Sequence, residues 1–497
     1  MFTFSDFKER REELKPFREY EVPRSTDYEV RVNGVEVPVY ACRISKYPFN
    51  RSWPGFQRPY DQSVEASYIN LISDEALALE ITVKREYQKV MLKPYSRNVK
   101  PNVCGDTVTF TLRENGNFIL ALDDYQHCLY VFNGKPVPCE EPEKVTYYFG
   151  AGIHNTGKIV LKDNESVYLE KDAYVFGCVF AENAKNIRVY GNGVFDDGCE
   201  ARIAGSCYHP YYTNGNIKFY DCENVSVEGV GFKDSAIFCV NVFHCKNVTI
   251  DGVKVFGQWR YNTDGVDIVN SQNVTLKNSF IHSFDDTVTV KGIEAYRDTD
   301  NLHILVKNCT LVCDWGRACE IGLETNCRLY DDITFRNCDV LHGGFAAMDI
   351  QNGDYAEVRN IRFENIRVEY EVFHRPEIQQ RTETQTYENV NDTIFSYLLN
   401  VTNLRSTCNA VKEDAEKMGL PAAQVHDIFV KDITVSYDDT IPLKDGKRQI
   451  PVQVENLVNG VTHYNIFIEN VTVNGEKFTK NDALLYLDSV ENFVWQE

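Results

Sequence analysis

The sequence predicts an all-β protein: a right-handed parallel β-helix, which is a solenoid, preceded by an N-terminal β-sandwich. Two observations lead to this prediction. Residues 1 to about 143 contain short alternating strands with no helical stretch between them, and after residue 144 a short strand motif recurs at a nearly constant period. The 29 Tyr and 29 Phe residues of the 497-residue chain also favour β structure.

The front part, residues 1–143, is interpreted as a β-sandwich domain. Its expected strands are short and are separated by Asn-Gly, Asp-Asp and Pro-containing turns, a spacing typical of sandwiches. The expected strands are Tyr28–Val39, Ala78–Lys84, Thr107–Leu112, Phe118–Leu122 and Cys128–Phe132. The proline-rich segment Pro136–Lys144 is the expected linker to the rest of the chain.

From residue 144 to residue 497 one motif keeps returning: two apolar residues flanking a variable one, usually with Asn or Asp just before them. Between Val225 and Ile361 its successive spacings are 23, 26, 30, 29 and 28 residues. A strand of this length fits one side of a β-helix coil, with each coil stacked about 4.8 Å from the last. The recurring Asn is expected to form an internal ladder between coils.

The repeat is interrupted between Ile361 and Ile428, a gap of 67 residues, and an insertion is predicted at about 371–425. Residues Ala410–Met418 within it have a helical pattern. We interpret the insertion as a side extension or a contact between subunits, and a homo-oligomer could also form through the N-terminal domain. The alternative is a loop that shapes a substrate cleft.

Composition narrows the classes of partner and cofactor. The 73 acidic and 52 basic residues give a formal charge of −21, which argues against nucleic acid or an anionic membrane as the main partner. The start of the chain lacks the apolar core of a secretion signal, so a cytoplasmic location with 16 reduced, mostly buried cysteines is expected. No metal-ligand spacing or phosphate-binding loop stands out, so we expect no metal and no cofactor.

Two acidic clusters lie about one coil apart. Asp264 precedes Asp285 by 21 residues and Asp286 by 22, which stacks the three carboxylates on one patch of the solenoid wall. Crowded carboxylates favour a state in which one keeps its proton near neutral pH. An acid beside ionised carboxylates is what glycosidic bond cleavage requires. The alternative is that these are ordinary turn residues, although Asp285-Asp286 leads directly into a strand.

These residues also carry a resemblance. The motif Asn262–Gly265 followed by the Asp285-Asp286 pair resembles the polygalacturonases of glycoside hydrolase family 28, and equally the related family 49 dextranases and isopullulanases. The resemblance implies a β-helix and hydrolysis with inversion of the anomeric centre. It also implies that Asp285 is the general acid, while Asp264 and Asp286 hold and activate the water.

Departures from the family 28 pattern affect the expected substrate. Polygalacturonases have a Gly-His-Gly where this chain has Gly316-Arg317-Ala318, and their later Arg-Ile-Lys has no counterpart in Ala347–Gln351. The acidic Asp349 in that segment is a poor partner for a uronate carboxylate. Together with the front domain, which family 49 members also carry, this favours a neutral, α-glucan-type substrate. The alternative is a galacturonide, whose acidic group Lys291 and Arg317 could bind.

Other side chains are expected to line the site. Trp259, Arg260 and Tyr261 precede the first aspartate and could form a sugar-stacking wall, or simply an ordinary turn. Trp315, Arg317 and Glu320 lie on the next coil. Strand alternation would place Asp267 on the face opposite Asp264, in a structural role, unless a bend intervenes.

Two other classes of function remain open. The first is a polysaccharide lyase on the same scaffold, which needs Ca²⁺ and a cationic base and releases a product that absorbs ultraviolet light. The second is a glycan-binding or structural solenoid without catalysis, which would bind glycans but release no reducing sugar.

Overall fold

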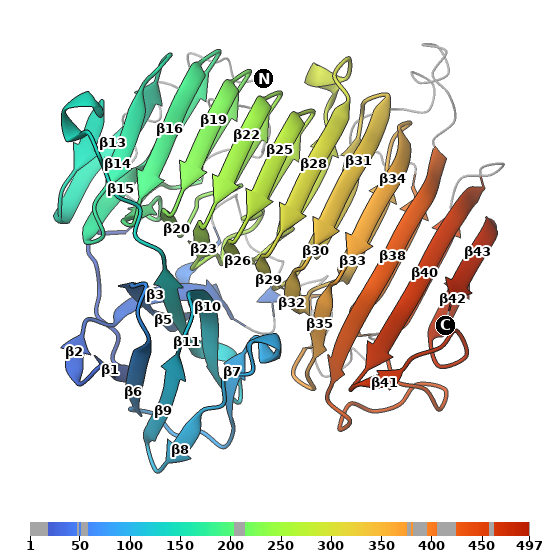
Figure 1. Cartoon of the computed structure of the whole chain (residues 1–497), viewed down its shortest axis with the longest axis horizontal. Helices are drawn as coiled ribbons and strands as arrows, with labels where there is room; N and C mark the ends of the chain where they lie inside the picture. The colour runs from blue at the N-terminus through green and yellow to red at the C-terminus, as the bar shows by residue number, and fades with distance from the viewer. Residues whose placement is uncertain are drawn as a thin grey trace.

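The computed structural model describes residues 18–46, 58–202, 214–374, 395–404, 424–456 and 462–496, together with the backbone of 49–50 and 379–380. In Figure 1 a small two-sheet domain, drawn in blue, lies against one side of a long row of parallel strands that runs from green to red. The prediction of an all-β chain with a front sandwich and a β-helix is confirmed. Within the described residues no helix is both long and apolar enough to cross a membrane.

The N-terminal domain consists of two five-stranded sheets. Alternation of buried and exposed residues along β6 (Leu77–Val83) shows why each sheet has one apolar face, and these faces pack together as a core that contains Ile81, Leu120 and Val131. The first sheet contains, in spatial order, β3 (Tyr40–Ser45), β5 (Ser63–Ile72), β11 (Asp124–Gly134), β10 (Gly116–Leu122) and β7 (Val90–Lys93). The second contains β2 (Val35–Val37), β1 (Tyr28–Val32), β6, β9 (Thr107–Leu112) and β8 (Asn102–Cys104).

The remaining long strands form one 31-stranded sheet that winds into coils, with each coil paired in parallel to the next. Parallel crossovers of this kind are right-handed. The recurring apolar position of the sequence motif is in register: Val225 pairs with Val248, which pairs with Val274, and the ladder continues through Ile304, Ile333, Ile361, Ile428 and Ile466. These side chains are buried in one continuous core, which stabilises the stack.

The coils have three faces, which we number in chain order within a coil. Face 1 contains β12 (Tyr147–Phe149), β14 (Ser166–Leu169), β16 (Lys185–Gly191), β19 (Glu223–Glu228), β22 (Lys246–Asp251), β25 (Gln272–Lys277), β28 (Asn301–Lys307), β31 (Leu329–Arg336), β34 (Glu357–Glu364), β38 (Gln424–Tyr437), β40 (His463–Val473) and β43 (Val490–Gln496). Face 2 contains β17 (Val194–Asp196), β20 (Gly231–Lys233), β23 (Lys254–Phe256), β26 (Phe280–Ser283), β29 (Thr310–Cys313), β32 (Asp339–Gly343) and β35 (Arg367–Tyr370), and it continues in the last residues of the long strands β38 and β40. Face 3 contains β18 (Ile217–Tyr220), β21 (Val240–Phe243), β24 (Val266–Val269), β27 (Val288–Gly292), β30 (Arg317–Thr325), β33 (Ala346–Asn352), β37 (Tyr397–Asn403), β39 (Pro451–Asn456) and β42 (Leu484–Leu487).

A few elements lie outside these faces. In the first coils, β13 (Gly152–Leu161) pairs with β15 (Ala173–Glu182), which pairs with both β17 and β18. The short strands β4 (Phe49–Asn50) and β36 (Gln379–Gln380) pair with each other, and β41 (Glu476–Lys477) pairs with β40. Single 3₁₀ turns occur at η1 (Tyr60–Gln62), η2 (Tyr95–Arg97), η3 (Pro142–Lys144) and η4 (Glu294–Tyr296).

The sandwich packs against face 2 through an aromatic interface. The ring of Phe132 lies 5.0 Å from that of Phe256 and 5.3 Å from that of Phe280. Beside them the hydroxyl of Tyr130 lies 2.6 Å from Nδ1 of His282. This buried contact between domains fixes the sandwich beside the coils that carry the acidic motifs.

One expectation about the coils needs correction. The asparagine ladder is real, because Asn224 donates to Asn186 at 3.0 Å and Asn247 donates to Asn224 at 3.1 Å, but it lies exposed on the surface. These residues occupy left-handed turns, with φ of 57° at Asn224, which suits Asn and leaves the interior to apolar side chains. Of the predicted insertion, Tyr397–Asn403 forms β37 within face 3, while Ala410–Met418 lies outside the described residues. Twelve of the fourteen described cysteines are buried, as expected.

Candidate active site

The acidic motifs stack where face 3 begins. Val266 of β24 pairs with Val288 of β27, so Asp264 and Asp286, each two residues earlier, occupy equivalent places on successive coils. The amide of Gly265 donates to the carbonyl of Asp286 at 2.8 Å, which fixes this register. On the next coil the carbonyl of Arg317 accepts from the amide of Thr287 at 2.7 Å. The expected stacking of the aspartates on one wall is therefore present.

Two glycines allow the coils to approach this closely. A Cβ atom on Gly265 would lie 2.4 Å from the carbonyl oxygen of Thr287, and one on Gly316 would lie 2.4 Å from Oδ1 of Asp286. Both distances are far below van der Waals contact, so a larger residue at Gly316 would displace the carboxylate of Asp286, and one at Gly265 would push against the backbone of the next coil at Thr287. Close packing between coils thus explains why glycine follows Asp264 and precedes Arg317 in the sequence.

Lys291 joins the carboxylates. Its ammonium lies 2.7 Å from Oδ2 of Asp264, 3.2 Å from Oδ1 of Asp267 and 3.5 Å from Oδ2 of Asp286. All four side chains are almost completely buried. One cation therefore holds three acidic groups from two coils in a single cluster.

Arg317 forms the other cationic centre. Its guanidinium lies 3.6 Å from Asp286, 3.8 Å from Glu320 and 3.8 Å from Asp349, and its side chain is 23% exposed. The carboxyl groups gathered around the two cations are those of Asp264, Asp267, Asp285, Asp286, Glu320 and Asp349. Because two cations cannot neutralise six buried carboxylates, some of the acids must keep their protons near neutral pH.

Asp285 and Asp286 differ most clearly. Burial, together with the charge of Asp286, raises the pKa of Asp285 to about 8. Burial also acts against ionisation of Asp286, but Lys291 and Arg317 outweigh it and hold the pKa of Asp286 below its ordinary value. The neutral Asp285 carboxyl accepts from the amide of Asp286 at 3.0 Å and from the side chain of Asn262 at 3.4 Å. A proton donor and an ionised acceptor are therefore adjacent.

Sequence reasoning missed the part played by Asp267 and Asp349. Asp267 faces Lys291 together with Asp264, so its expected place on the opposite face is wrong. Alternation does not apply because Asp264 precedes β24, whose first residue is Val266. Burial raises the pKa of both Asp267 and Asp349 to about 6. The parallel register, which places Asp349 beside Glu320, was the signal that could have located it.

Glu320 lies where it was expected, on the coil after Asp286. It is fully buried, and burial followed by the charge of Asp286 raises its pKa well above the ordinary value. Its two oxygens have no hydrogen-bond donor among the described residues. As a neutral acid it can itself donate to a neighbouring carboxylate, which removes the cost of burying it unpaired.

Trp259 and Arg260 are not placed to form the expected sugar-stacking wall. Trp259 is fully buried, its indole donates to Asp234 at 3.0 Å, and its ring meets Tyr60 edge-on at 5.8 Å. Arg260 is 1% exposed and donates to the carbonyls of Gly198 and Glu200. Both residues instead form hydrogen bonds to the preceding coils. These contacts join segments that are distant in the sequence, so they are visible only in the folded chain.

The half-buried aromatic surface beside the carboxylates is formed by Tyr261 and Trp315 instead. Their ring centroids lie 5.6 Å apart, and Trp315 also stacks on Phe284 at 5.8 Å. Both are partly exposed, as is Asn262. Aromatic faces next to a proton donor suit the apolar face of a pyranose ring.

Among the described residues one further group has metal-ligand spacing. Ligand atoms of Cys178, Asp197 and Glu200 lie within 4.8 Å of one another. However, both oxygens of Glu200 accept from Asn214, and Asp197 accepts from the amide of Ala236. These existing hydrogen bonds account for the group as a structural cluster.

The fold and the cluster of acids define a class of protein, a β-helix that carries a buried carboxylate site on its wall. Residues 146–442 match the sequence profile described as Glycosyl hydrolases family 28. This protein belongs to that family. The general expectation of a polygalacturonase-like glycoside hydrolase is thereby confirmed.

Individual relatives are more distant. The chain is 29% identical over 170 residues to a probable endopolygalacturonase D of Neosartorya fischeri, covering 31% of this chain and 34% of that protein. It is 31% identical over 152 residues to a probable rhamnogalacturonase A of Aspergillus oryzae, covering 30% of each. The matched stretch thus spans about a third of the length of these relatives. The fold is similar to that of Dex49A from Penicillium minioluteum, with a TM-score of 0.65, 13% identity and coverage of 95% of this chain and 94% of that one.

Proposed function

We propose that this protein hydrolyses α-glycosidic bonds of a galacturonic-acid-containing polysaccharide or oligosaccharide with inversion of configuration. The observation that carries the proposal is the opposite pKa shift of Asp285 and Asp286 within one buried cluster. The substrate class is supported by the relatives, which are named polygalacturonases and rhamnogalacturonases. The comparisons favour this alternative over the neutral α-glucan expected from the sequence.

In this mechanism Asp285 is the general acid. Its pKa of about 8 keeps it protonated at neutral pH, so it can donate a proton to the oxygen of the leaving sugar. Asp286 stays ionised and accepts a proton from the attacking water. Burial raises the pKa of Asp264 well above its ordinary value, although Lys291 opposes this, so Asp286 is the better base and Asp264 the group that orients the water.

Cations near the acids suit a substrate that carries carboxylates. Arg317 is the partly exposed one, and its guanidinium also packs 5.0 Å from the ring of Phe345. A uronate placed beside the catalytic pair could accept hydrogen bonds from Arg317. A neutral α-glucan is the second candidate, favoured by the buried Asp349, which accepts from Asn400 and Gln351 where family 28 has a cationic segment.

The test is proton NMR of the first-formed anomer over a panel of substrates: oligogalacturonides, rhamnogalacturonan fragments and dextran oligosaccharides. Hydrolysis of an acidic substrate with release of the inverted anomer supports the proposal. Turnover confined to dextran would replace the substrate class, and retention of configuration would contradict the mechanism. A product absorbing ultraviolet light would indicate a lyase, and binding without any product would indicate a non-catalytic solenoid.

A further inference from the structure

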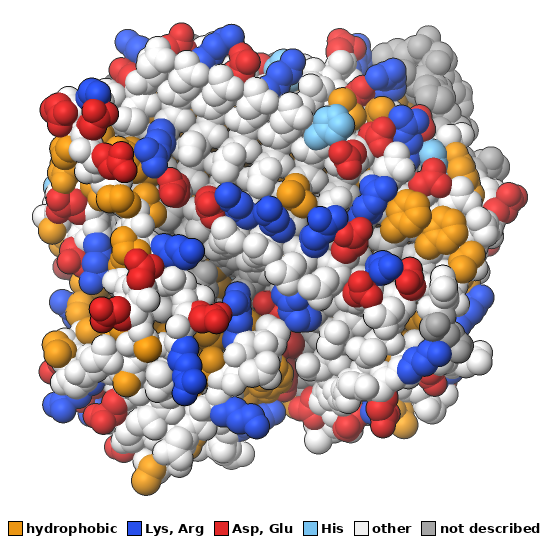
Figure 2. Space-filling view, in the orientation of Figure 1, with side chains coloured by type: hydrophobic (Ala, Val, Ile, Leu, Met, Phe, Trp, Pro, Cys, Tyr) orange, Lys and Arg blue, Asp and Glu red, His pale blue; other side chains and the backbone are white. Residues whose placement is uncertain are grey.

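A polar cavity lies between the two domains. It has a volume of about 710 Å³ and is lined on one side by the sandwich and η2, and on the other by the coil corners between faces 1 and 2. Figure 2 shows the surface hollowed between the sandwich and the row of coils, with blue side chains around the hollow. The volume lies within the range of about 300–1,000 Å³ that is usual for small-molecule sites.

This cavity is separate from the catalytic carboxylates. It borders the start of face 2, where Lys254 begins β23, whereas Asp264 follows the end of that strand on the way to face 3. None of the described residues that line it belongs to the catalytic cluster. The two sites therefore flank the same strands, on which the sandwich packs.

The acidic side chains of the cavity already have cationic partners. Glu228 pairs with Arg188 at 2.8 Å, and Asp251 pairs with Lys277 at 3.1 Å. The third acid, Asp339, pairs with Arg367 at 2.5 Å. None of these carboxylates is left to neutralise a further cation.

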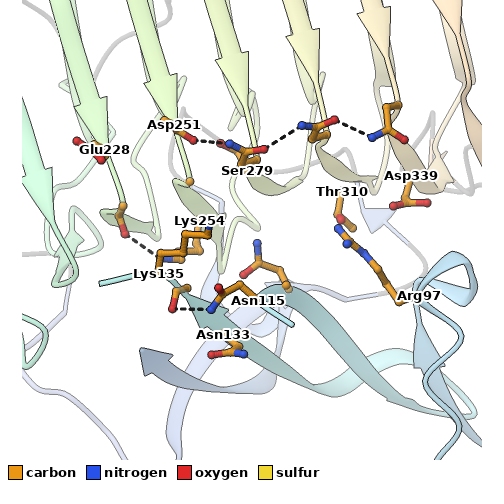
Figure 3. Close-up of a pocket in the computed structure, with 18 of the residues that line it drawn as sticks. Arg97, Asn115, Asn133, Lys135, Glu228, Asp251, Lys254, Ser279, Thr310 and Asp339 are labelled. Atoms are coloured by element: carbon orange, nitrogen blue, oxygen red, sulfur yellow. Dashed lines mark hydrogen bonds between the residues drawn. The ribbon is translucent and has the colours of Figure 1, made fainter. Parts of the chain in front are cut away.

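Three cations of the cavity lack such a partner. Arg97 and Lys135 are exposed, and within the described part of the chain neither forms an ion pair. Figure 3 shows Arg97 reaching from the sandwich towards the coils, with Lys254 on the coil side. In a protein with a formal charge of −21, three cations without a carboxylate partner around one cavity are a specific feature, and they favour an anion there.

Of the three cations, Lys254 is the strongest evidence for an anion site, because its side chain is buried, with 3% of its surface exposed. Its ammonium donates to the carbonyl of Gly229 at 2.8 Å, and no described carboxylate lies within ion-pair distance. Burial alone lowers its pKa to about 8. Burying an ammonium without a counter-charge is costly, so an anion that enters the cavity would be favoured.

The cavity also offers acceptors. Asn117 and Asn133 line it, and Oδ1 of each has no hydrogen-bond donor among the described residues; both oxygens are covered, so each side chain must turn towards the cavity to accept from a ligand. A ligand that satisfies both the cations and these carbonyl oxygens must carry negative charge and hydroxyl groups together. Along the opposite rim, Asn278 donates to Asp251 and Asn308 donates to Asn278, which is the ladder of dashed lines in Figure 3.

We propose that this interdomain cavity is a second saccharide-binding site, which takes a uronic-acid-containing oligosaccharide. Its carboxylates bind Lys254, Arg97 and Lys135, and its hydroxyl groups donate to Asn117 and Asn133. The choice of a uronate among hydroxylated anions rests on the proposed function. Binding here holds an acidic chain beside the coils while the catalytic cluster acts elsewhere on the same polymer, which raises its effective concentration.

The test is isothermal titration calorimetry on full-length Asp285→Asn protein, in which turnover is blocked. The probes are a galacturonic acid tetrasaccharide, maltotetraose and inorganic phosphate. We expect two binding events for the tetrasaccharide. Arg97→Gln with Lys135→Gln, both at exposed positions, should weaken one event about tenfold, at two- to fivefold for each exposed charge. Lys254→Met should abolish that event, and the control Lys246→Gln, an exposed lysine on face 1, should change neither.

Several results would overturn the proposal. One is tetrasaccharide binding that is unchanged in the Arg97/Lys135 variant, which keeps the test valid even if Lys254→Met fails to fold. Others are maltotetraose binding as tightly as the acidic probe, or phosphate binding as tightly as the tetrasaccharide, which would indicate a simple anion site. Failure of the proposed function gives a different signature: wild-type protein would leave galacturonans uncleaved, whatever the calorimetry of the cavity shows.

Discussion

Asp285 and Asp286 are adjacent in the chain, yet the protein shifts the pKa values of their carboxyl groups in opposite directions. The difference comes from their surroundings: Asp286 contacts Lys291 and Arg317, while Asp285 accepts hydrogen bonds from a backbone amide and from the side chain of Asn262. Two neighbouring acids thereby acquire the separate roles of proton donor and proton acceptor.

Replacing the donor should stop turnover. Asp285→Asn keeps the size of the side chain but cannot donate a proton as an acid, so kcat should fall by roughly 10²- to 10⁴-fold. Release of reducing sugar measures this, and circular dichroism checks the fold. Asp332→Asn is the matched control, because Asp332 is an exposed acid in a left-handed turn, with φ of 58°, that Asn also adopts. An Asp285→Asn enzyme within threefold of the wild-type rate would refute the assignment.

In the pH profile of kcat/KM, the alkaline decline should occur at an unusually high pH for a carboxylic acid. Activity requires Asp285 to be protonated, and its pKa is about 8, so the rate should decline as pH rises through about 8. Activity also requires Asp286 to be ionised, and its pKa lies below the ordinary value, so the rate should stay level down to about pH 4. An alkaline limb near pH 5 would show that Asp285 is not the proton donor.

Asp285 should also reduce stability as pH rises. Its folded pKa is raised, so the folded state binds one more proton than the unfolded state between about pH 4 and 8, and stability falls across that window. Asp285→Asn removes this penalty. Thermal melts should therefore show a Tm advantage of the variant that grows between pH 5 and 8. If the variant were less stable than the wild type at pH 8, the pKa of Asp285 would not be raised in the folded state.

Lys291 should be essential for the stability of the fold, and it should set the pH at which kcat/KM declines on the acidic side. Lys291→Met leaves Asp264, Asp267 and Asp286 without their shared cation, and breaking a buried pair of this kind costs about 3–5 kcal/mol in the free energy of unfolding. Loss of the cation should also move the acidic limb to higher pH. Urea unfolding and the kcat/KM profile measure the two effects.

Two further variants make the Lys291 test specific. Lys246→Met, at an exposed lysine, should change the free energy of unfolding by less than about 0.5 kcal/mol. Adding Asp264→Asn to Lys291→Met should recover part of the loss, because one uncompensated carboxylate is removed. If the double variant were as unstable as the sum of the single changes, Lys291 and Asp264 would not be coupled.

The fold could be predicted because its cause is periodic. Each coil repeats one strand pattern, and a one-residue error in register would turn every apolar side chain outward, so Val225, Val248 and Val274 specify the stack by their spacing alone. The same periodicity places Asp264 and Asp286 on one wall. The position of the asparagine ladder was not predictable from spacing, because a left-handed turn turns the side chain towards solvent.

The residues around the site are positioned by contacts between distant segments of the chain. The sequence did not predict these contacts. Trp259 is buried because its indole reaches Asp234 on the preceding coil and Tyr60 from the sandwich covers it. Asp267 joins the cluster because the chain enters β24 after Gly265, which breaks the alternation. The pattern of neighbouring residues in the sequence carries no information about either effect.

Arg317 provides the sharpest test of the substrate. If it binds a uronate carboxylate, Arg317→Gln should raise KM for an oligogalacturonide by about 10- to 100-fold, the value of hydrogen bonds to a charged group, and leave KM for a dextran oligosaccharide unchanged. Because Arg317 also lies 3.6 Å from Asp286, kcat should fall for any substrate that is cleaved, so the ratio of the two KM changes is the informative quantity. Arg317→Lys, which keeps the charge, should recover most of the KM. Equal KM changes for acidic and neutral sugars would assign Arg317 to positioning Asp286 alone and would remove its role in substrate choice.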